Sequence, residues 1–359
     1  MYKTLYEVTQ YQDDLRISIK NTVDFRLLAG KRIMITGATG LVGSYLADMF
    51  SLWNLEQSSV LSKIQIYVCS RSAKNLEKRF KGCWEASCLH FIEQDFNEQL
   101  HFDEQVDFII HAASNAYPAA FNRDPVGTML TNIIGTNELL QYANAKKVKR
   151  FVFISTGEVY GEMNKDVVAF LESHSGYIDI TSPRSCYPSS KRAAETLCVS
   201  YGKQFGVDVV IARLCHTYGP NVTGSDNRAT TQFIYDVLVG HDIILKSKGL
   251  QLRSYSYIAD CASGILSIMT SGECGQAYNI ANPDSRITIS DFAHIVAEFA
   301  GKSVKFMIPN SQHQSEETPI SRAVLDSHKA ELLGWRNQFG PREGIKHTME
   351  IMNLIKKAK

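Results

Sequence analysis

The sequence has no long apolar run, no excess of charge of either sign and no cysteine pattern typical of a metal site. No stretch of its 359 residues reaches the roughly 18 apolar residues that a transmembrane helix needs. Lysine and arginine number 38 and aspartate and glutamate 37, so nothing favours a nucleic-acid or membrane-surface partner. The eight cysteines form no C-x-x-C pair and no Cys/His cluster at zinc spacing, so we expect no metal site.

The first residues also lack the apolar core of a signal peptide. Scattered cysteines without a framework are typical of a reducing compartment, so we expect free thiols and a cytoplasmic location. With 44% hydrophobic residues, the chain can bury a large core in one or two lobes.

What the sequence does have is an alternation of short apolar strands with helical stretches. The predicted strands cover residues 31–36, 64–69, 90–95, 106–111, 150–155 and 207–212. Helical apolar spacing separates them, most clearly over 126–145 and 187–204. Strands that alternate with helices predict an α/β fold with a doubly wound parallel sheet of the Rossmann type.

A glycine-rich turn follows the first strand. Gly37, Gly40 and Gly43 have the spacing G-x-x-G-x-x-G between a strand and a helix. The first glycine permits a tight turn, the second lets the backbone approach a pyrophosphate, and the third lets helix and strand pack closely. The helix N-terminus adds N–H groups that bind phosphate. The pattern therefore predicts a dinucleotide site.

The ends of the second and third strands indicate which dinucleotide is bound. Ser70 and Arg71 stand where an NAD site usually carries an acidic residue. An arginine accommodates a 2′-phosphate, so this position favours NADP over NAD. Asp95 and Phe96 end the third strand, and we expect them to touch the adenine.

Tyr187 and Lys191 are spaced i and i+4 on one face of a predicted helix. A tyrosine with the ordinary pKa of about 10 is a poor base at neutral pH, but an ammonium one turn away stabilises its phenolate. Tyr187 can then take a proton from a hydroxyl as hydride leaves the same carbon for the dinucleotide. The pair predicts an acid/base for hydride transfer.

Further motifs follow in order along the chain: Thr36-Gly-Ala-Thr-Gly-Leu-Val-Gly43, His111-Ala-Ala-Ser114, Thr131-Asn-Ile-Ile-Gly-Thr136, Ser155-Thr-Gly-Glu-Val-Tyr-Gly161, Pro183-Arg-Ser-Cys-Tyr-Pro-Ser-Ser-Lys191, Ala212-Arg-Leu-Cys-His-Thr-Tyr-Gly-Pro220, Arg253-Ser-Tyr-Ser-Tyr-Ile-Ala-Asp260 and Leu333-Gly-Trp335. With them the chain resembles the extended short-chain dehydrogenase/reductase family, in its nucleotide-sugar epimerase, dehydratase and decarboxylase branch. The closest likeness is to UDP-glucuronate decarboxylases. The resemblance covers the chain from Lys31 to Glu350.

The resemblance implies roles for individual residues. Thr156 would hydrogen-bond the reacting hydroxyl, and Lys191 would also hold the nicotinamide ribose. Arg253 would bind the substrate pyrophosphate, with His216 and Arg228 as further substrate contacts. The remaining residues expected to bind NAD(P), beyond the glycines and strand ends, are Leu41, Val42, Ala112, Ala113, Ser114, Asn132 and Tyr187.

Three regions are expected. Residues 1–30 would form a helical extension that caps the domain, and 31–220 the NAD(P)-binding Rossmann domain. Residues 221–359, where the alternation loosens, would form mainly the nucleotide-sugar-binding lobe. The boundary is soft because helical segments are expected to fold back. The long helices resemble those of the family's four-helix dimer interface, which implies a homodimer.

The reaction type stays open at this point. The family oxidises the sugar at C4, after which epimerisation, dehydration across C5–C6 or decarboxylation can follow. Glu158 resembles the glutamate of dehydratases and decarboxylases and argues against a simple 4-epimerase. Gly157 replaces the Asp or Ser usual there and cannot protonate a leaving hydroxyl, so decarboxylation is favoured over 4,6-dehydration. An NADPH-dependent keto-sugar reductase and a non-catalytic dinucleotide sensor are further alternatives.

Overall fold

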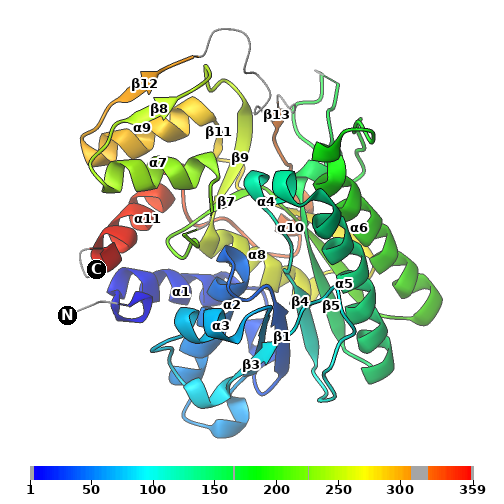
Figure 1. The fold of residues 1–359 in the computed structure, drawn as a ribbon. Coiled ribbons are helices and arrows are strands. Elements are labelled where there is room, and N and C mark those ends of the chain that lie inside the picture. Colours follow the sequence, from blue (N-terminus) through cyan, green and yellow to red (C-terminus); the bar gives the residue numbers. More distant parts are fainter. Residues whose placement is uncertain (1–3, 165, 225, 309–321, 357–359) are drawn as a thin grey trace.

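A computed structural model gives the fold and describes residues 4–164, 166–224, 226–308 and 322–356. A large sheet with helices on both faces forms the lower and right part of the molecule in Figure 1. A smaller lobe with its own short strands lies at the upper left, and the first helix lies below it.

The central sheet of the described chain has seven parallel strands. Their order across the sheet is β10 (Gln276–Ile280), β6 (Val209–Leu214), β5 (Arg150–Thr156), β4 (Phe108–His111), β1 (Arg32–Thr36), β2 (Gln65–Ser70) and β3 (Leu89–Glu93). The chain winds outward from β1 through β2 and β3, and then in the other direction through β4, β5 and β6, so the predicted doubly wound parallel sheet is confirmed. β10 comes from beyond residue 220 and has no counterpart among the predicted strands.

Helices cover both faces of the sheet because the strands alternate apolar side chains between them. Ile33 and Ile35 of β1 belong to one core cluster, and Met34 to the other. The first face is covered by α2 (Leu41–Leu55), α3 (Ala73–Arg79) and α8 (Ile258–Ser271), and α1 (Thr9–Asn21) packs on α2 and α8. The second face is covered by α5 (Pro125–Lys146) and α6 (Cys186–Phe205).

The small lobe combines two short sheets with three longer helices. One sheet contains β7 (His216–Tyr218), β9 (Leu252–Tyr257), β11 (Arg286–Thr288) and β13 (Arg322–Ala323), and the other β8 (Ile243–Leu245) and β12 (Val304–Phe306). The helices are α7 (Ala229–Leu238), α9 (Ile289–Ala300) and α11 (Pro341–Lys356). Part of this lobe, from β7 to β9, lies between β6 and β10, two neighbouring strands of the large sheet, and the rest follows β10.

Short helices complete the fold. They are η1 (Leu5–Glu7), η2 (Phe25–Leu28), η3 (Val60–Ser62), η4 (Ala86–Cys88), α4 (Pro118–Arg123), η5 (Gly157–Tyr160), η6 (Pro183–Ser185) and α10 (His328–Glu331). All eight cysteines are free thiols. Among the described residues, no helix combines the length and apolarity needed to cross a bilayer.

Candidate active site

A cleft of about 1060 Å³ opens at the carboxyl ends of the parallel strands and continues below the small lobe. In doubly wound sheets ligands bind at this edge, where the strand order reverses. Here the reversal lies between β1 and β4. The predicted site residues that line the cleft are Gly37, Gly40, Leu41, Val42, Gly43, Ser70, Arg71, Asp95, Phe96, Ala112, Ala113, Ser114, Thr156, Glu158, Tyr187, Lys191, His216, Arg228 and Arg253.

Two walls face each other across this cleft. The turn wall comprises residues 37–43, 70–72, 95–96 and 112–114, which follow β1, β2, β3 and β4. The tyrosine wall comprises Phe121, Thr156, Glu158, Arg184, Tyr187, Lys191, His216 and Arg253. Asn132 lines neither wall, because it is fully buried in α5 and its Nδ2 donates to Ser190 Oγ at 2.9 Å.

The glycine turn leaves no room for side chains. Gly37 has a φ of +64°, and a Cβ there would lie 2.7 Å from the backbone of Ala112 and Ala113. A Cβ on Gly43 would lie 2.7 Å from the carbonyl oxygen of Gly37. α2 begins directly after Gly40, whose residue type offers no capping side chain, so the first N–H groups of the helix point into the cleft. This cradle fits the pyrophosphate of a dinucleotide.

The end of β2 carries hydroxyl and cationic groups. Ser70, Arg71 and Ser72 line the cleft, and Asn75 and Lys78 of α3 lie beside them. Among the described residues, the acidic one that lines this part of the cleft is Asp95, after β3, while Glu93 of β3 accepts the Ala73 N–H beside it. This part of the lining is thus rich in hydroxyl and cationic side chains.

A buried histidine at the end of β4 helps to hold residues 112–114 of the turn wall in place. His111 lies between Thr36 Oγ1 at 2.7 Å and Thr136 Oγ1 at 3.2 Å. Burial lowers its pKa to about 3, so the imidazole is neutral. Thr36 Oγ1 also accepts the Ala113 N–H at 3.1 Å, which holds the wall after β4 against β1.

Tyr187 and Lys191 are both buried on the face of α6 that meets the end of β5. Lys191 Nζ donates to the Ile154 carbonyl at 2.8 Å and lies 4.6 Å from the centre of the Phe153 ring. Burial lowers the pKa of Lys191 to about 7, although the negative charge of Glu195 acts to raise it.

The same burial raises the pKa of Tyr187 above its ordinary value, and the charge of Glu158 adds to this. A hydrogen bond with Thr156 and the charges of Arg228 and Arg184 act in the opposite direction. In the protein without a ligand, the Tyr187 phenol is therefore protonated. A positive charge brought into the cleft next to it would favour the phenolate.

Thr156, Gly157 and Glu158 follow one another where β5 ends. Thr156 Oγ1 accepts the Glu158 N–H at 3.2 Å, so its own hydroxyl proton can be donated into the cleft. A Cβ on Gly157 would lie 3.3 Å from both methyl groups of Leu325. An acid at position 157 would therefore crowd Leu325, which gives a packing reason for the glycine.

Arg184 is a cleft residue that the sequence reasoning missed. Its Nη2 donates to both carboxylate oxygens of Glu158, at 2.9 and 3.2 Å. Its guanidinium carbon lies 4.4 Å from the centre of the Phe121 ring, and that ring stacks on Tyr187 with centroids 5.4 Å apart. Arg184 stands three residues before Tyr187 in the motif, a spacing that could have singled it out. For Phe121 the sequence offers no comparable signal.

The far end of the cleft carries the predicted substrate contacts. Arg253 of β9 is only 3% exposed. Its burial lowers its pKa, although the charges of Tyr255 and Glu158 act to raise it. His216 pairs with Tyr255 across β7 and β9 and opens on the cleft. Removal from bulk solvent and the charges of Arg253 and Arg228 lower its pKa, so it is neutral.

Arg228 is less available than the sequence suggested. Its guanidinium forms an ion pair with Asp226 at 2.6 Å and donates to the Thr217 carbonyl at 2.9 Å. Its charge is thus largely balanced within the protein. In the part of the chain that the structure describes, no group of His, Cys, Asp and Glu could hold a metal ion.

Comparison with known proteins gives three kinds of likeness. Residues 33–281 match the sequence profile of the NAD dependent epimerase/dehydratase family. A UDP-glucuronic acid decarboxylase from Danio rerio is 33% identical over 90% of this chain and 73% of its own length. One from Arabidopsis thaliana is 34% identical over 90% of this chain and 89% of its own.

Solved structures show the same fold. UDP-glucose 4-epimerase from Thermotoga maritima, solved with UDP-glucose, superposes with a TM-score of 0.73 at 24% identity, over 89% of this chain and 98% of its own. dTDP-glucose 4,6-dehydratase from Streptomyces venezuelae, solved with NAD, gives a TM-score of 0.70 at 24% identity, over 89% and 96%.

Proposed function

The chain belongs to the NAD dependent epimerase/dehydratase family, and from this premise we propose that it decarboxylates a nucleoside diphosphate uronate of the UDP-glucuronate type. The observation that carries the proposal is the pairing of Arg184 with Glu158 beside Tyr187. A uronate brings a carboxylate to the sugar end of the cleft. Arg184 contacts Glu158 through Nη2, and the other N–H groups of its guanidinium can bind the incoming carboxylate. The decarboxylases at about one-third identity support the same assignment.

The first chemical step rests on Tyr187, Lys191 and Thr156. The Thr156 hydroxyl orients the C4 hydroxyl of the sugar, and Tyr187 takes its proton. When bound along the turn wall, a nicotinamide dinucleotide would supply the acceptor for the C4 hydride and a positive charge that lowers the pKa of Tyr187. Lys191, buried one helical turn away, stabilises the phenolate that starts this step.

The product of this oxidation is a 4-keto uronate, in which the C5 carboxylate belongs to a β-keto acid. The C5–C6 bond breaks, carbon dioxide leaves, and the electron pair remains as an enolate over C5, C4 and the C4 oxygen. No acid at position 157 is needed, because carbon dioxide leaves without a proton. C5 then requires a proton from solvent, which Glu158 is placed to pass on. Return of the hydride to C4, and of the proton from Tyr187 to the C4 oxygen, would close the cycle.

Mass spectrometry of the products tests this proposal. Purified protein is mixed with UDP-glucuronate and with neutral UDP-, dTDP-, GDP- and CDP-hexoses, without added coenzyme. We expect carbon dioxide to be lost from the uronate and the hexoses to return unchanged. Loss of water from a hexose would replace the proposal by 4,6-dehydration. Unchanged masses throughout would leave epimerisation or net reduction, which retention time and added NADPH separate.

A variant locates the carboxylate contact. Arg184→Gln should raise the KM for the uronate by about tenfold, because a charge-assisted bidentate contact is lost. Binding of UDP alone should stay unchanged. Arg123→Gln is the matched control, since Arg123 is an exposed arginine near Phe121 that does not line the cleft.

For the coenzyme we propose NADP rather than NAD. Ser70, Arg71 and Ser72 support this, with Lys78 beside them, since together they offer hydroxyl and cationic partners for a 2′-phosphate. Denaturing the purified protein and identifying the released dinucleotide by mass spectrometry decides the question. NADP in the supernatant is the expected result, and NAD would refute this part.

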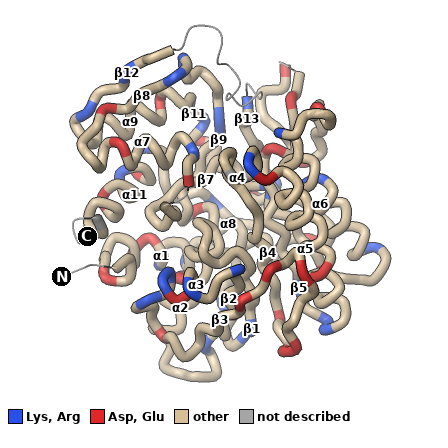
Figure 2. The backbone as a smooth tube through the Cα atoms, in the orientation of Figure 1, with Lys and Arg blue, Asp and Glu red and all other residues tan. Residues whose placement is uncertain are grey.

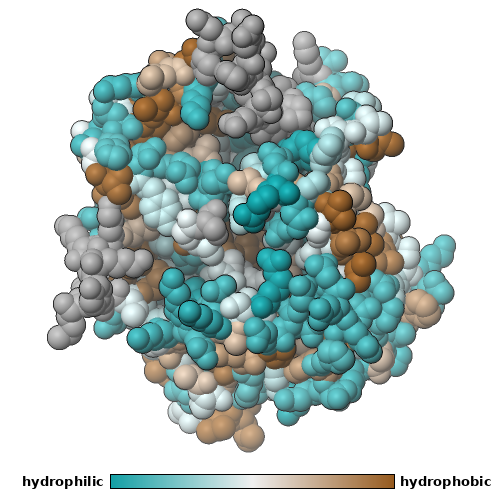
Figure 3. Space-filling view, viewed as in Figure 1, coloured by the Kyte–Doolittle hydropathy of each residue, from teal (hydrophilic) through white to brown (hydrophobic). Residues whose placement is uncertain are grey.

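We further propose a homodimer formed through α5 and α6, in a reducing cytoplasm that suits eight free thiols. Val126, Met129, Leu130 and Ile134 lie at helical spacing on α5 and are exposed. Brown atoms gather near α4 and α5 at the right of Figure 3. Light scattering should give twice the chain mass, and Leu130→Glu should give monomers.

A further inference from the structure

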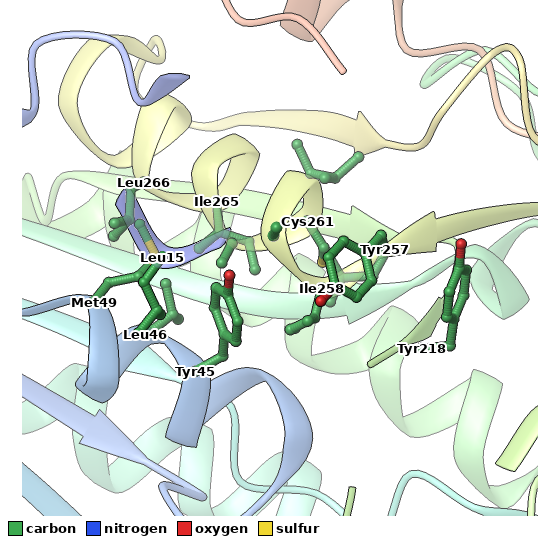
Figure 4. Close-up of a cluster of buried hydrophobic side chains, with 14 of the residues drawn as sticks. Leu15, Tyr45, Leu46, Met49, Tyr218, Tyr257, Ile258, Cys261, Ile265 and Leu266 are labelled. Atoms are coloured by element: carbon green, nitrogen blue, oxygen red, sulfur yellow. The ribbon is translucent and has the colours of Figure 1, made fainter. Parts of the chain in front are cut away.

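The N-terminal helix lies between the two parts of the molecule that form the cleft. In Figure 1, α1 runs between α11 of the small lobe and α2 and α3 of the large domain. Leu15 of α1 is fully buried in the main core cluster. Figure 4 shows it among Leu46 and Met49 of α2 and Leu266 of α8. Residues 4–21 are thus part of the core and not a loose appendage.

One end of this segment is bound to α2 and α3, the helices that directly follow two segments of the turn wall. Asp48 of α2 is fully buried and accepts hydrogen bonds from Tyr6 Oη at 3.0 Å and Tyr11 Oη at 2.6 Å. It also forms an ion pair with Arg79, the last residue of α3, which lines the cleft. Tyr6 Oη accepts a further hydrogen bond from Arg79 Nη1 at 2.8 Å. Charged segments of α2 and α3 meet at this place in Figure 2.

The middle of this segment is bound to the strand that carries Arg253. Asp14 of α1 is fully buried and accepts a hydrogen bond from Tyr257 Oη at 2.6 Å. It also lies 3.0 Å from Nδ1 of His347 in α11. Tyr257 ends β9, four residues after Arg253, and its own side chain does not line the cleft.

We propose that residues 4–21 form a brace that sets the spacing between the coenzyme side and the sugar-nucleotide side of the cleft. Tyr6 and Tyr11 are its positioning residues toward α2 and α3, and Asp14 is its positioning residue toward β9 and α11. A buried carboxylate is costly unless each acceptor position is filled, so both aspartates hold their donors in one geometry. The role at β9 rests on the proposed function, whereas the role at α2 and α3 requires only a bound dinucleotide.

The coenzyme end is tested with the double variant Tyr6→Phe/Tyr11→Phe, which removes two hydroxyls and keeps both rings. We expect bound dinucleotide to leave about tenfold faster, because hydrogen bonds to a buried charge are lost beneath α2 and α3. The measurement is the coenzyme retained by the purified holoprotein at intervals after dilution. The Kd for UDP should stay within twofold of its original value.

The sugar-nucleotide end is tested with Tyr257→Phe. This variant should weaken UDP binding about fivefold, since β9 loses its hydrogen bond to Asp14. Coenzyme release should not change. Asp14→Asn should weaken UDP binding in the same direction, because a neutral amide oxygen holds the Tyr257 hydroxyl less strongly than a carboxylate does. The fold should be kept, because asparagine has the size of aspartate.

Asp13→Asn is the matched control, because Asp13 is the exposed neighbour of Asp14 on the same helix. It should leave both measurements unchanged. Equal effects of Asp13→Asn, or a lower Tm in the tyrosine variants with unchanged coenzyme release, would overturn the brace and reduce residues 4–21 to a stabilising segment. Coenzyme release needs no turnover, so this result stands even if no uronate is decarboxylated.

Discussion

The two walls of the cleft are built from different material. The turn wall is built around backbone, since three glycines without side chains lead into the first N–H groups of α2. The tyrosine wall presents side chains from α4, β5, η5, η6, α6, β7 and β9. A backbone wall depends on close packing and tolerates no added atom. A side-chain wall keeps its shape when one group is removed but loses the chemistry of that group.

The largest effect should come from removing a single oxygen of the tyrosine wall. Tyr187→Phe keeps the ring on Phe121, and we expect kcat to fall about 10³-fold because the acid/base for the C4 hydroxyl is lost. Coenzyme content, measured on the denatured protein, should not change. If the Tyr187→Phe variant also lost its coenzyme, the tyrosine wall would contribute to coenzyme binding and the two walls would not have separate roles.

The next largest effect should come from adding a single carbon to the turn wall. In Gly43→Ala the new Cβ would meet the Gly37 oxygen at 2.7 Å and the Ala38 Cα at 2.9 Å, and neither can move aside. We expect a loss of about 2–3 kcal/mol in the free energy of unfolding and loss of bound coenzyme. Denaturant melts compared with Gly340→Ala, where nothing lies within 4 Å of the added carbon, check this.

Arg71 is the place where the turn wall depends on a side chain. Arg71→Asp should move the preference from NADP toward NAD by about thirtyfold, because the 2′-phosphate loses a cation and the ribose hydroxyls gain an acceptor. Exchange of the bound coenzyme against each dinucleotide gives the ratio. If the ratio of NADP to NAD affinity does not change, the backbone of the turn wall alone determines which coenzyme is bound. The turn wall would then differ even more clearly from the tyrosine wall.

The smallest effect should arise outside both walls, at His347. Its hydrogen bond to Asp14 raises its pKa above the ordinary 6.5, so the pair stabilises the fold fully below pH 6.5 and less as pH rises through the raised pKa. Tm should therefore fall by about 2 °C over that rise. His347→Gln should remove this slope, whereas His328→Gln, an exposed control, should keep it.

Much of the turn wall could be predicted from the sequence because its determinants are local. The strand, the three glycines and the helix lie within 31–55, and period-two and period-3.6 patterns show them directly. The parallel sheet followed from repeating that unit and is confirmed. β10 could not be predicted from such a local pattern, because Gln276–Ile280 is a short strand whose partner, β6, ends more than sixty residues earlier.

The tyrosine wall could be predicted only where it lies in a motif. Thr156, Glu158 and Tyr187 are found there, and the structure brings them together, while their roles stay predictions. The contact of Arg184 with Glu158 joins two motifs and is visible only in three dimensions. Asp14 gave no signal at all, since an aspartate in a polar helix is ordinary until the chain folds around it.

The place of β10 also affects how the protein is made. During synthesis, β6 leaves the ribosome before the segment that contains α7, β9 and α8. β10, the last strand of the large sheet, follows that segment. At about 5–20 residues per second, β6 remains an open sheet edge for several seconds. Unpaired edges recruit other strands, so this interval is when a nascent chain is most prone to aggregate and most dependent on chaperones.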